Sequence, residues 1–325
     1  MPLQLHVGAP ASAPIDEQAK FYARAEELGF AGVGAADDAR YADPFDVLSA
    51  AVDVTRSIWL YPAVTNPATR TAVQQVRLIQ GLAERAPGRI KIALGTGDAA
   101  IIDIAHDRPV KAKHPAHLAT LKKRVLDVRE MLGEGSVALF DHLPRGLPTE
   151  LLPPPVMMAA SGERTLEAAG EVADEVFVTS GLTSEARRAV TSAIALGASR
   201  SQRRAREVPV MYHAMVSMDD DRDAAIERTR WWLHFLLGRG VFRLSLKAMR
   251  LPAPPFPTQE SIPADFMERL ASGFALAGTP KEVRARVERL ESDGVRTVFC
   301  MLPGGPKQNR QALERIARHL LPVVG

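Results

Sequence analysis

Short apolar runs alternate with longer amphipathic segments along most of this chain of 325 residues. The amphipathic segments carry apolar residues three or four positions apart, which is the spacing of one helix face. They predict helices at about 16–28, 44–55, 70–84, 116–132, 163–172, 184–196, 219–237, 280–292 and 309–320. The apolar runs predict strands at 3–7, 31–36, 58–64, 90–94, 155–160, 175–178, 208–216 and 297–301. Strands that alternate with helices are typical of a parallel sheet covered by helices.

The number of predicted strands favours an α/β fold of the (β/α)8 TIM-barrel type. A doubly wound open sheet is the alternative, but its first strand normally leads into a glycine-rich phosphate loop, and Gly8-Ala9-Pro10-Ala11 has no such fingerprint. Three segments interrupt the alternation, at about 103–117, 133–155 and 238–273. The second includes a short β-like piece at 137–140, and the third includes a proline-rich run that cannot form a helix or a central strand. We interpret all three as insertions into a single barrel domain spanning residues 1–325.

Composition narrows the class of protein. The chain has 41 basic and 38 acidic residues, and this small excess argues against a dedicated nucleic-acid-binding protein. No run approaches the ~20 apolar residues of a membrane span, and the N-terminus lacks the pattern of a signal peptide. Cys300, the single cysteine, excludes an intrachain disulfide and fits a reducing compartment. We therefore expect a cytoplasmic protein with a small-molecule substrate and neither a membrane nor a nucleic acid as partner.

Polar and glycine-rich clusters follow five of the predicted strands. They are Asp37-Asp38, Thr65-Asn66, Gly95-Thr96-Gly97-Asp98, Ser161-Gly162 and Thr179-Ser180-Gly181. Because the carboxyl ends of parallel barrel strands meet at one mouth, these clusters predict one shared pocket. The two glycines around Thr96 form either a tight turn or a surface that a planar ring can approach closely. Each of the last two clusters precedes a helix, and each is either a simple cap or a phosphate site.

Ionisable residues near these ends have two interpretations. Asp37 and Asp38 either cap the following turn or act in catalysis, and Asp98 either starts a helix or lies near a reacting ring. His6 and His213 fall within strands, where a packed or ring-facing residue is favoured over a metal ligand. We expect no metal site, because no set of His, Asp and Glu has a recognisable ligand spacing.

Several stretches in the same order resemble one known family. They are Ala-Glu-Glu-Leu-Gly-Phe at 25–30, Ala-Val-Thr-Asn-Pro-Ala-Thr-Arg at 63–70, Gly-Arg at 88–89, Gly-Thr-Gly-Asp at 95–98, and the segment 160–170 with Ala-Asp at 173–174. The sequence resembles the luciferase-like flavin-dependent oxidoreductases, and within them the coenzyme F420-dependent branch that includes methylenetetrahydromethanopterin reductase. The Val-Thr-Asn-Pro element with its following arginine is the most diagnostic part of this resemblance.

The resemblance implies a cofactor site and a reaction. It implies a non-prolyl cis peptide at Ala63–Val64 that backs the ring of the cofactor, coenzyme F420 or alternatively FMN. The other residues implied at the ring are Asp37, Thr65, Asn66, Gly95, Thr96 and Gly97, and those implied at the phosphate are Ser161, Gly162, Thr179, Ser180 and Gly181. The candidate catalytic residues are Asp37, Asp38 and Asp98, and the implied chemistry is hydride transfer at C5 of the deazaflavin. A homodimer is also implied.

This chain departs from the pattern of its relatives at two positions, and two other functions are alternatives. Relatives that oxidise sugar phosphates have His where this chain has Asp38, so that activity is not expected. Many relatives have Ser after the Gly-Asp pair, where this chain has Ala99. The alternatives are an FMN-dependent monooxygenase that activates O₂ and a non-catalytic binding paralogue. The paralogue would require bulky residues in the pocket, whereas Gly34, Gly95 and Gly97 are small.

Overall fold

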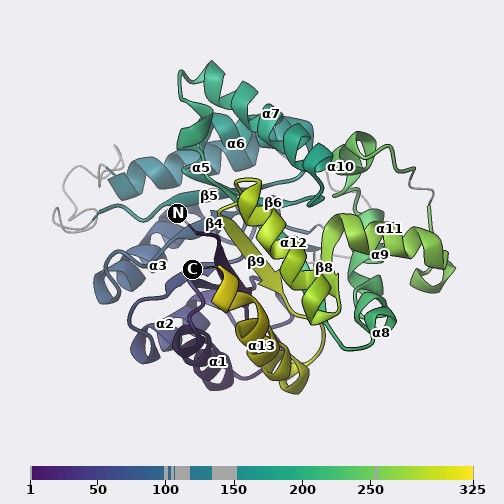
Figure 1. Cartoon of the computed structure of the whole chain (residues 1–325). Helices are drawn as coiled ribbons and strands as arrows, with labels where there is room; N and C mark the ends of the chain where they lie inside the picture. The colour runs from purple at the N-terminus through teal and green to yellow at the C-terminus, as the bar shows by residue number, and fades with distance from the viewer. Residues whose placement is uncertain are drawn as a thin grey trace, which may run out of the picture.

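A nearly closed barrel of parallel strands forms the centre of the molecule (Figure 1). The structure is a computed structural model that describes residues 2–98, 102–103, 106, 118–133, 152–252 and 255–324. The barrel strands are β1 (Gln4–Gly8), β2 (Gly32–Ala35), β3 (Trp59–Pro62), β4 (Ile92–Leu94), β5 (Val156–Ala160), β6 (Glu175–Thr179), β7 (Val210–Met218) and β9 (Thr297–Met301). They pair in the order β3-β2-β1-β9-β7-β6-β5-β4, and isolated bridges Leu60–Ile90 and Thr65–Leu94 join β3 to β4. The predicted barrel is confirmed.

Helices cover the outside of the barrel. They are α1 (Ile15–Leu28), α2 (Pro44–Val54), α3 (Ala72–Arg85), α5 (Leu118–Gly133), α6 (Glu163–Val172), α7 (Ser184–Arg200), α12 (Pro280–Ser292) and α13 (Pro306–Leu320). Their ends follow local signals. Gly29 ends α1 with φ 99°, and the side chain of Asp43 caps α2 by accepting the amide of Phe45. Thr279 begins α12 with a capping box, with Pro280 in the first turn.

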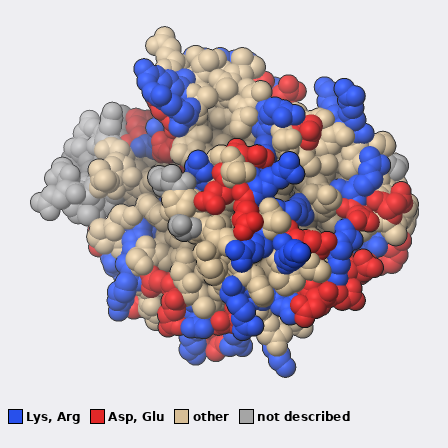
Figure 2. Space-filling view, in the orientation of Figure 1, with Lys and Arg blue, Asp and Glu red and all other residues tan. Residues whose placement is uncertain are grey.

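Apolar side chains form separate layers inside and outside the barrel wall. The interior is filled by Tyr61, Ala93, Met157, Phe177, Met211 and Phe299. A larger cluster lies between the strands and the surrounding helices, and it includes the buried Cys300. On the face drawn in Figure 2, basic and acidic residues are interspersed over the surface. Within the described ranges no helix is both long and apolar enough to cross a membrane.

The segment after β7 differs most from the prediction. The helix predicted at 219–237 is two helices, α8 (Arg222–Glu227) and α9 (Arg230–Gly238). Thr229 is buried between the two helices, and its hydroxyl donates a hydrogen bond to the carbonyl of Ile226 at 2.7 Å. A β-branched residue with this local hydrogen bond competes with helix continuation. Beyond the break, Trp232 of α9 packs against His213.

The predicted insertion at 238–273 is largely helical. It contains α10 (Arg243–Ala248) and α11 (Ala264–Phe274), which share an apolar cluster with α9 and Met215. A ninth strand that the sequence did not predict, β8 (Ala275–Gly278), follows α11 directly and pairs with the second half of β7. Its small residues have a low preference for strands, so the strand forms because its backbone pairs with β7. The predicted piece at 137–140 and most of 103–117 lie outside the described residues.

Candidate functional site

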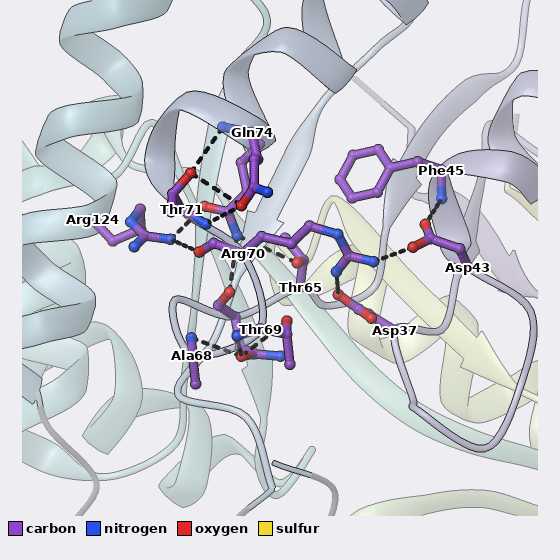
Figure 3. A network of polar contacts seen from close by, with 12 residues as sticks. Asp37, Asp43, Phe45, Thr65, Ala68, Thr69, Arg70, Thr71, Gln74 and Arg124 are labelled. Carbon is purple, nitrogen blue, oxygen red and sulfur yellow. Dashed lines mark hydrogen bonds and ion pairs between the residues drawn. The ribbon is translucent and has the colours of Figure 1, made fainter. Parts of the chain in front are cut away.

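Arg70 joins the ends of β2 and β3 at the mouth of the barrel. Its Nη1 lies 2.7 Å from Oδ2 of Asp37, and its Nη2 pairs with Asp43 (Figure 3). The guanidinium carbon also lies 5.2 Å from the centre of the Phe45 ring. Side-chain exposure is 15% for Arg70 and 10% for Asp37, so this ion pair is only weakly screened by water. The arrangement holds the Asp37 carboxylate in one position.

The loop after β3 is fixed by hydrogen bonds from buried side chains. The Ala63–Val64 peptide is cis, as the resemblance implies. Asn66 is buried, and its Oδ1 accepts the amides of Ala68 at 2.9 Å and Thr69 at 3.1 Å. The side-chain Nε2 of Gln75 donates to the backbone carbonyl of Asn66 at 2.9 Å. The backbone of this loop is therefore tied both to itself and to α3.

The loop after β4 lies directly beside the loop after β3. The amide of Thr65 donates to Ala93 at 2.9 Å, and the amide of Gly95 donates to Thr65 at 2.8 Å. Glycine is needed at both flanks of Thr96. A Cβ on Gly95 would lie 2.8 Å from Cγ2 of Val64, and Gly97 has φ 78°. The structure thus brings together the two predicted ring-side clusters.

Arg124 connects this region to α5. Its guanidinium donates to the carbonyl of Arg70 at 2.6 Å and to Oε1 of Gln75 at 2.9 Å. It therefore holds the backbone of the β3 loop from outside the barrel. Nothing in the sequence around Arg124, which lies in the middle of an amphipathic helix, marks it for this contact.

The two adjacent carboxylates after β2 differ in their surroundings. Burial raises the pKa of Asp37 above its ordinary value, although a hydrogen bond with Thr65 and the charge of Arg70 oppose the shift. Burial also acts to raise the pKa of Asp38, but its ion pair with Arg40 at 2.6 Å contributes to a net lowering. Asp38 is therefore held as a carboxylate by an exposed arginine. Asp98, after β4, forms an ion pair with Arg239 of the α9 end at 2.8 Å.

Both strand histidines are packed residues. Nδ1 of His6 lies 2.8 Å from the Tyr61 hydroxyl, and burial lowers the pKa of His6 to about 3. Nδ1 of His213 lies 3.0 Å from the Thr179 hydroxyl, and burial lowers the pKa of His213 to about 4. Both rings are thus neutral near pH 7. Among the described residues no group of three His, Cys, Asp or Glu could hold a metal ion.

The two candidate phosphate loops differ. Ser161, which precedes α6, is partly exposed. Gly162 caps the start of that helix, and its backbone amide donates to the Thr165 hydroxyl at 3.1 Å. The next amides of α6 have no partner within their own helix, as in the first turn of any α-helix. After β6, the Gly181 amide donates instead to the hydroxyl of Ser245 at 3.0 Å. That loop is joined to α10, a contact with no signal in the sequence.

These features define a parallel βα-barrel whose polar loops gather at the carboxyl ends of its strands, the usual place for a barrel active site. The family model for luciferase-like monooxygenases matches residues 2–297. The chain therefore belongs to the luciferase-like monooxygenase family, whose members are oxidoreductases.

Individual proteins similar to this chain have named activities. The 5,10-methylenetetrahydromethanopterin reductase of Methanolobus tindarius is 27% identical over 95% of this chain and 97% of its own length. The F420-dependent glucose-6-phosphate dehydrogenase of Rhodococcus erythropolis is 26% identical over 73% of this chain and 69% of its own length. The structure of the coenzyme F420-dependent tetrahydromethanopterin reductase from Methanopyrus kandleri superposes with a TM-score of 0.81 and 22% identity, covering both chains completely.

Proposed function

We propose that this protein binds coenzyme F420 at the mouth of its barrel and transfers a hydride between the deazaflavin and a small organic substrate. The observation that carries the proposal is the direct hydrogen bonding that joins the loops after β3 and β4 at Thr65 and Gly95. The full-length similarity to a reductase and the F420-dependent dehydrogenase relative support it.

The residues present suit such a cofactor. Gly95 packs against Val64 and Gly97 packs against Asn66, so the loops after β3 and β4 form one compact surface on which we place the planar ring. At the other end, the first turn of α6 offers amide groups and the positive end of the helix dipole to a phosphate. The bound deazaflavin would supply the hydride at its C5 position.

Within this proposal the protein positions the reactants. Ala63, Val64, Thr65, Asn66, Gly95, Thr96 and Gly97 line the ring, with Asp37 beside Thr65. Ser161 and Gly162 bind the phosphate, with Thr179, Ser180 and Gly181 forming the adjacent wall. All three candidate aspartates pair with an arginine. Asp37 is the main catalytic candidate because it is the most buried of the three and burial raises its pKa, whereas the pKa of Asp38 is lowered. Rigid placement of reacting groups is a large part of the catalytic effect in such enzymes.

Titration of the purified protein with F420 and, separately, with FMN tests the proposal through quenching of cofactor fluorescence. We expect saturable binding of F420 that is at least tenfold tighter than binding of FMN. Tight binding of FMN alone would instead favour a monooxygenase, as in the name of the family. Binding of neither cofactor would favour a non-catalytic paralogue.

Substitution Ser161→Asp should weaken cofactor binding without weakening the fold. Two like charges about 4 Å apart at a protein surface repel by several kcal/mol, and partial solvation reduces this to about 2–3 kcal/mol, or a 30- to 150-fold rise in Kd. An aspartate before α6 is otherwise favourable to the helix dipole. The matched control is Ser184→Asp at the start of α7, which should leave the Kd unchanged. Equal affinities for the two variants would place the phosphate elsewhere.

A further inference from the structure

A cavity lies at the carboxyl ends of β7 and β9, between α13 and the pair α8–α9. Its volume is about 670 Å³, within the usual range of small-molecule sites. The polar and aromatic residues that matter for binding are Ser217, Arg228, Trp231, Gln308, Gln311 and Arg315. In the strand order of the barrel, β7 and β9 stand opposite β3 and β4. The cavity is therefore at the functional end of the barrel but across it from the proposed ring-side loops.

Ser217 gives the cavity an unsatisfied polar group. The residue is 2% exposed, and its hydroxyl has no hydrogen-bond partner among the described residues. A buried hydroxyl without a partner is destabilising, and such groups in folded proteins are uncommon. Ser217 lines the cavity but its hydroxyl oxygen is itself buried, so a polar atom of a ligand would satisfy it once the side chain rotates towards the cavity.

Trp231 gives the cavity a flat apolar surface. This residue is 45% exposed, whereas its neighbour Trp232 is buried against His213. Because the buried Trp232 anchors α9, the indole of Trp231 is held at the surface of the cavity. Such a surface favours a ligand that stacks on the indole. Gln308 and Gln311, on α13, are exposed and present amide groups along the rim.

The charges on the cavity wall favour an acidic ligand. Arg228 is paired with Asp219, which also lines the cavity. Arg315 donates one N–H to the carbonyl of Met218 at 3.0 Å, and its nearest carboxylate, Asp220, is 3.8 Å away. Asp220 is 86% exposed, so this contact is strongly screened and holds Arg315 weakly. The guanidinium of Arg315 can therefore receive an anion.

We propose that this cavity binds a flat aromatic compound that carries one acidic group. Its ring stacks on Trp231, its acidic group pairs with Arg315, and a polar atom bonds to the Ser217 hydroxyl after that side chain rotates towards the cavity. This site uses none of the residues assigned to the cofactor, so it goes beyond the proposed function and can be tested without F420.

Naphthalene-2-carboxylate is a suitable probe, with naphthalene-2-carboxamide as its uncharged counterpart. Binding is measured by calorimetry and by quenching of tryptophan fluorescence. For a probe of this size we expect a Kd of about 1 mM or lower for the carboxylate. The amide should bind at least fivefold more weakly. The absence of saturable carboxylate binding up to about 10 mM, or equal binding of both probes, would overturn the proposal.

Three variants separate binding from folding. Trp231→Ala should weaken carboxylate binding about tenfold, whereas Phe235→Ala, one turn along α9 and 46% exposed, should not. Ser217→Ala should raise the Kd about fivefold while leaving the Tm unchanged or higher, because it removes an unsatisfied buried hydroxyl. A merely structural serine would instead lower the Tm and leave the Kd unchanged. That result, or equal losses in the two aromatic variants, would contradict the site.

Discussion

Replacing Gly197 with alanine is expected to lower the free energy of unfolding by about 3 kcal/mol. At this position α7 crosses α6 with backbone against backbone. A Cβ on Gly197 would lie 1.8 Å from the carbonyl oxygen of Glu167, and a Cβ on Gly170 would lie 2.1 Å from that of Ile194. Main-chain atoms cannot move aside as a flexible side chain can, so the two helices would have to separate. Urea denaturation of the purified variant measures the loss.

Gly81 provides the matched control. It lies in α3, and a Cβ added there would have nothing within 4 Å, so the same substitution adds no clash. Gly81→Ala should raise stability by about 0.5–1 kcal/mol, because alanine restricts the unfolded chain and favours the helix. A Gly197→Ala variant as stable as the original protein would show that α6 and α7 are not in such close contact.

Replacing Arg70 with methionine is expected to cost about 2–3 kcal/mol at pH 8. The variant keeps apolar contact with Phe45 but leaves the carboxylates of Asp37 and Asp43 without their shared cation. Removing one partner of a buried ion pair strongly destabilises a protein, and the partial exposure of Asp43 reduces that effect here. Urea denaturation at several pH values provides the measurement.

The pH dependence identifies the cause of that loss. Burial already raises the pKa of Asp37, and the charge of Arg70 opposes the shift, so the variant raises this pKa further. A carboxyl group with a raised pKa binds more protons when folded than when unfolded. Asp37 therefore destabilises the folded protein fully at a pH above its pKa in the folded state. It has no such effect at a pH below its pKa in the unfolded state. The deficit of Arg70→Met should shrink as the pH is lowered from 8 towards 5.

Arg85→Met is the control for this experiment. Arg85 pairs with Asp53 on the protein surface, where the two side chains are 43% and 69% exposed. Such a pair contributes about 0.5 kcal/mol or less. A deficit for Arg70→Met that is as small as this, or that does not change with pH, would show that Arg70 does not control the ionisation of Asp37.

Much of the site followed from the order of elements. Once strands alternate with helices around a barrel, the carboxyl end of every strand lies at one mouth. The clusters after β3 and β4 could therefore be grouped from the sequence, and the structure connects them through Thr65 and Gly95. The contacts that hold those loops could not be predicted in this way. Arg124 and Ser245 come from helices distant in sequence, and their surroundings in the chain are ordinary helix patterns.

The repeating strand and helix pattern, most helix ends and the mouth at which polar loops gather can all be derived from the amino-acid sequence. These are local properties, set by apolar spacing, capping residues and turn-forming glycines. The break at Thr229, the pairing of β8 with β7, and the difference between Asp37 and Asp38 become evident in the folded molecule alone. Each of these depends on which distant residues are packed nearby. Burial and charge at a given side chain are products of that packing, and neighbours in the sequence do not specify them.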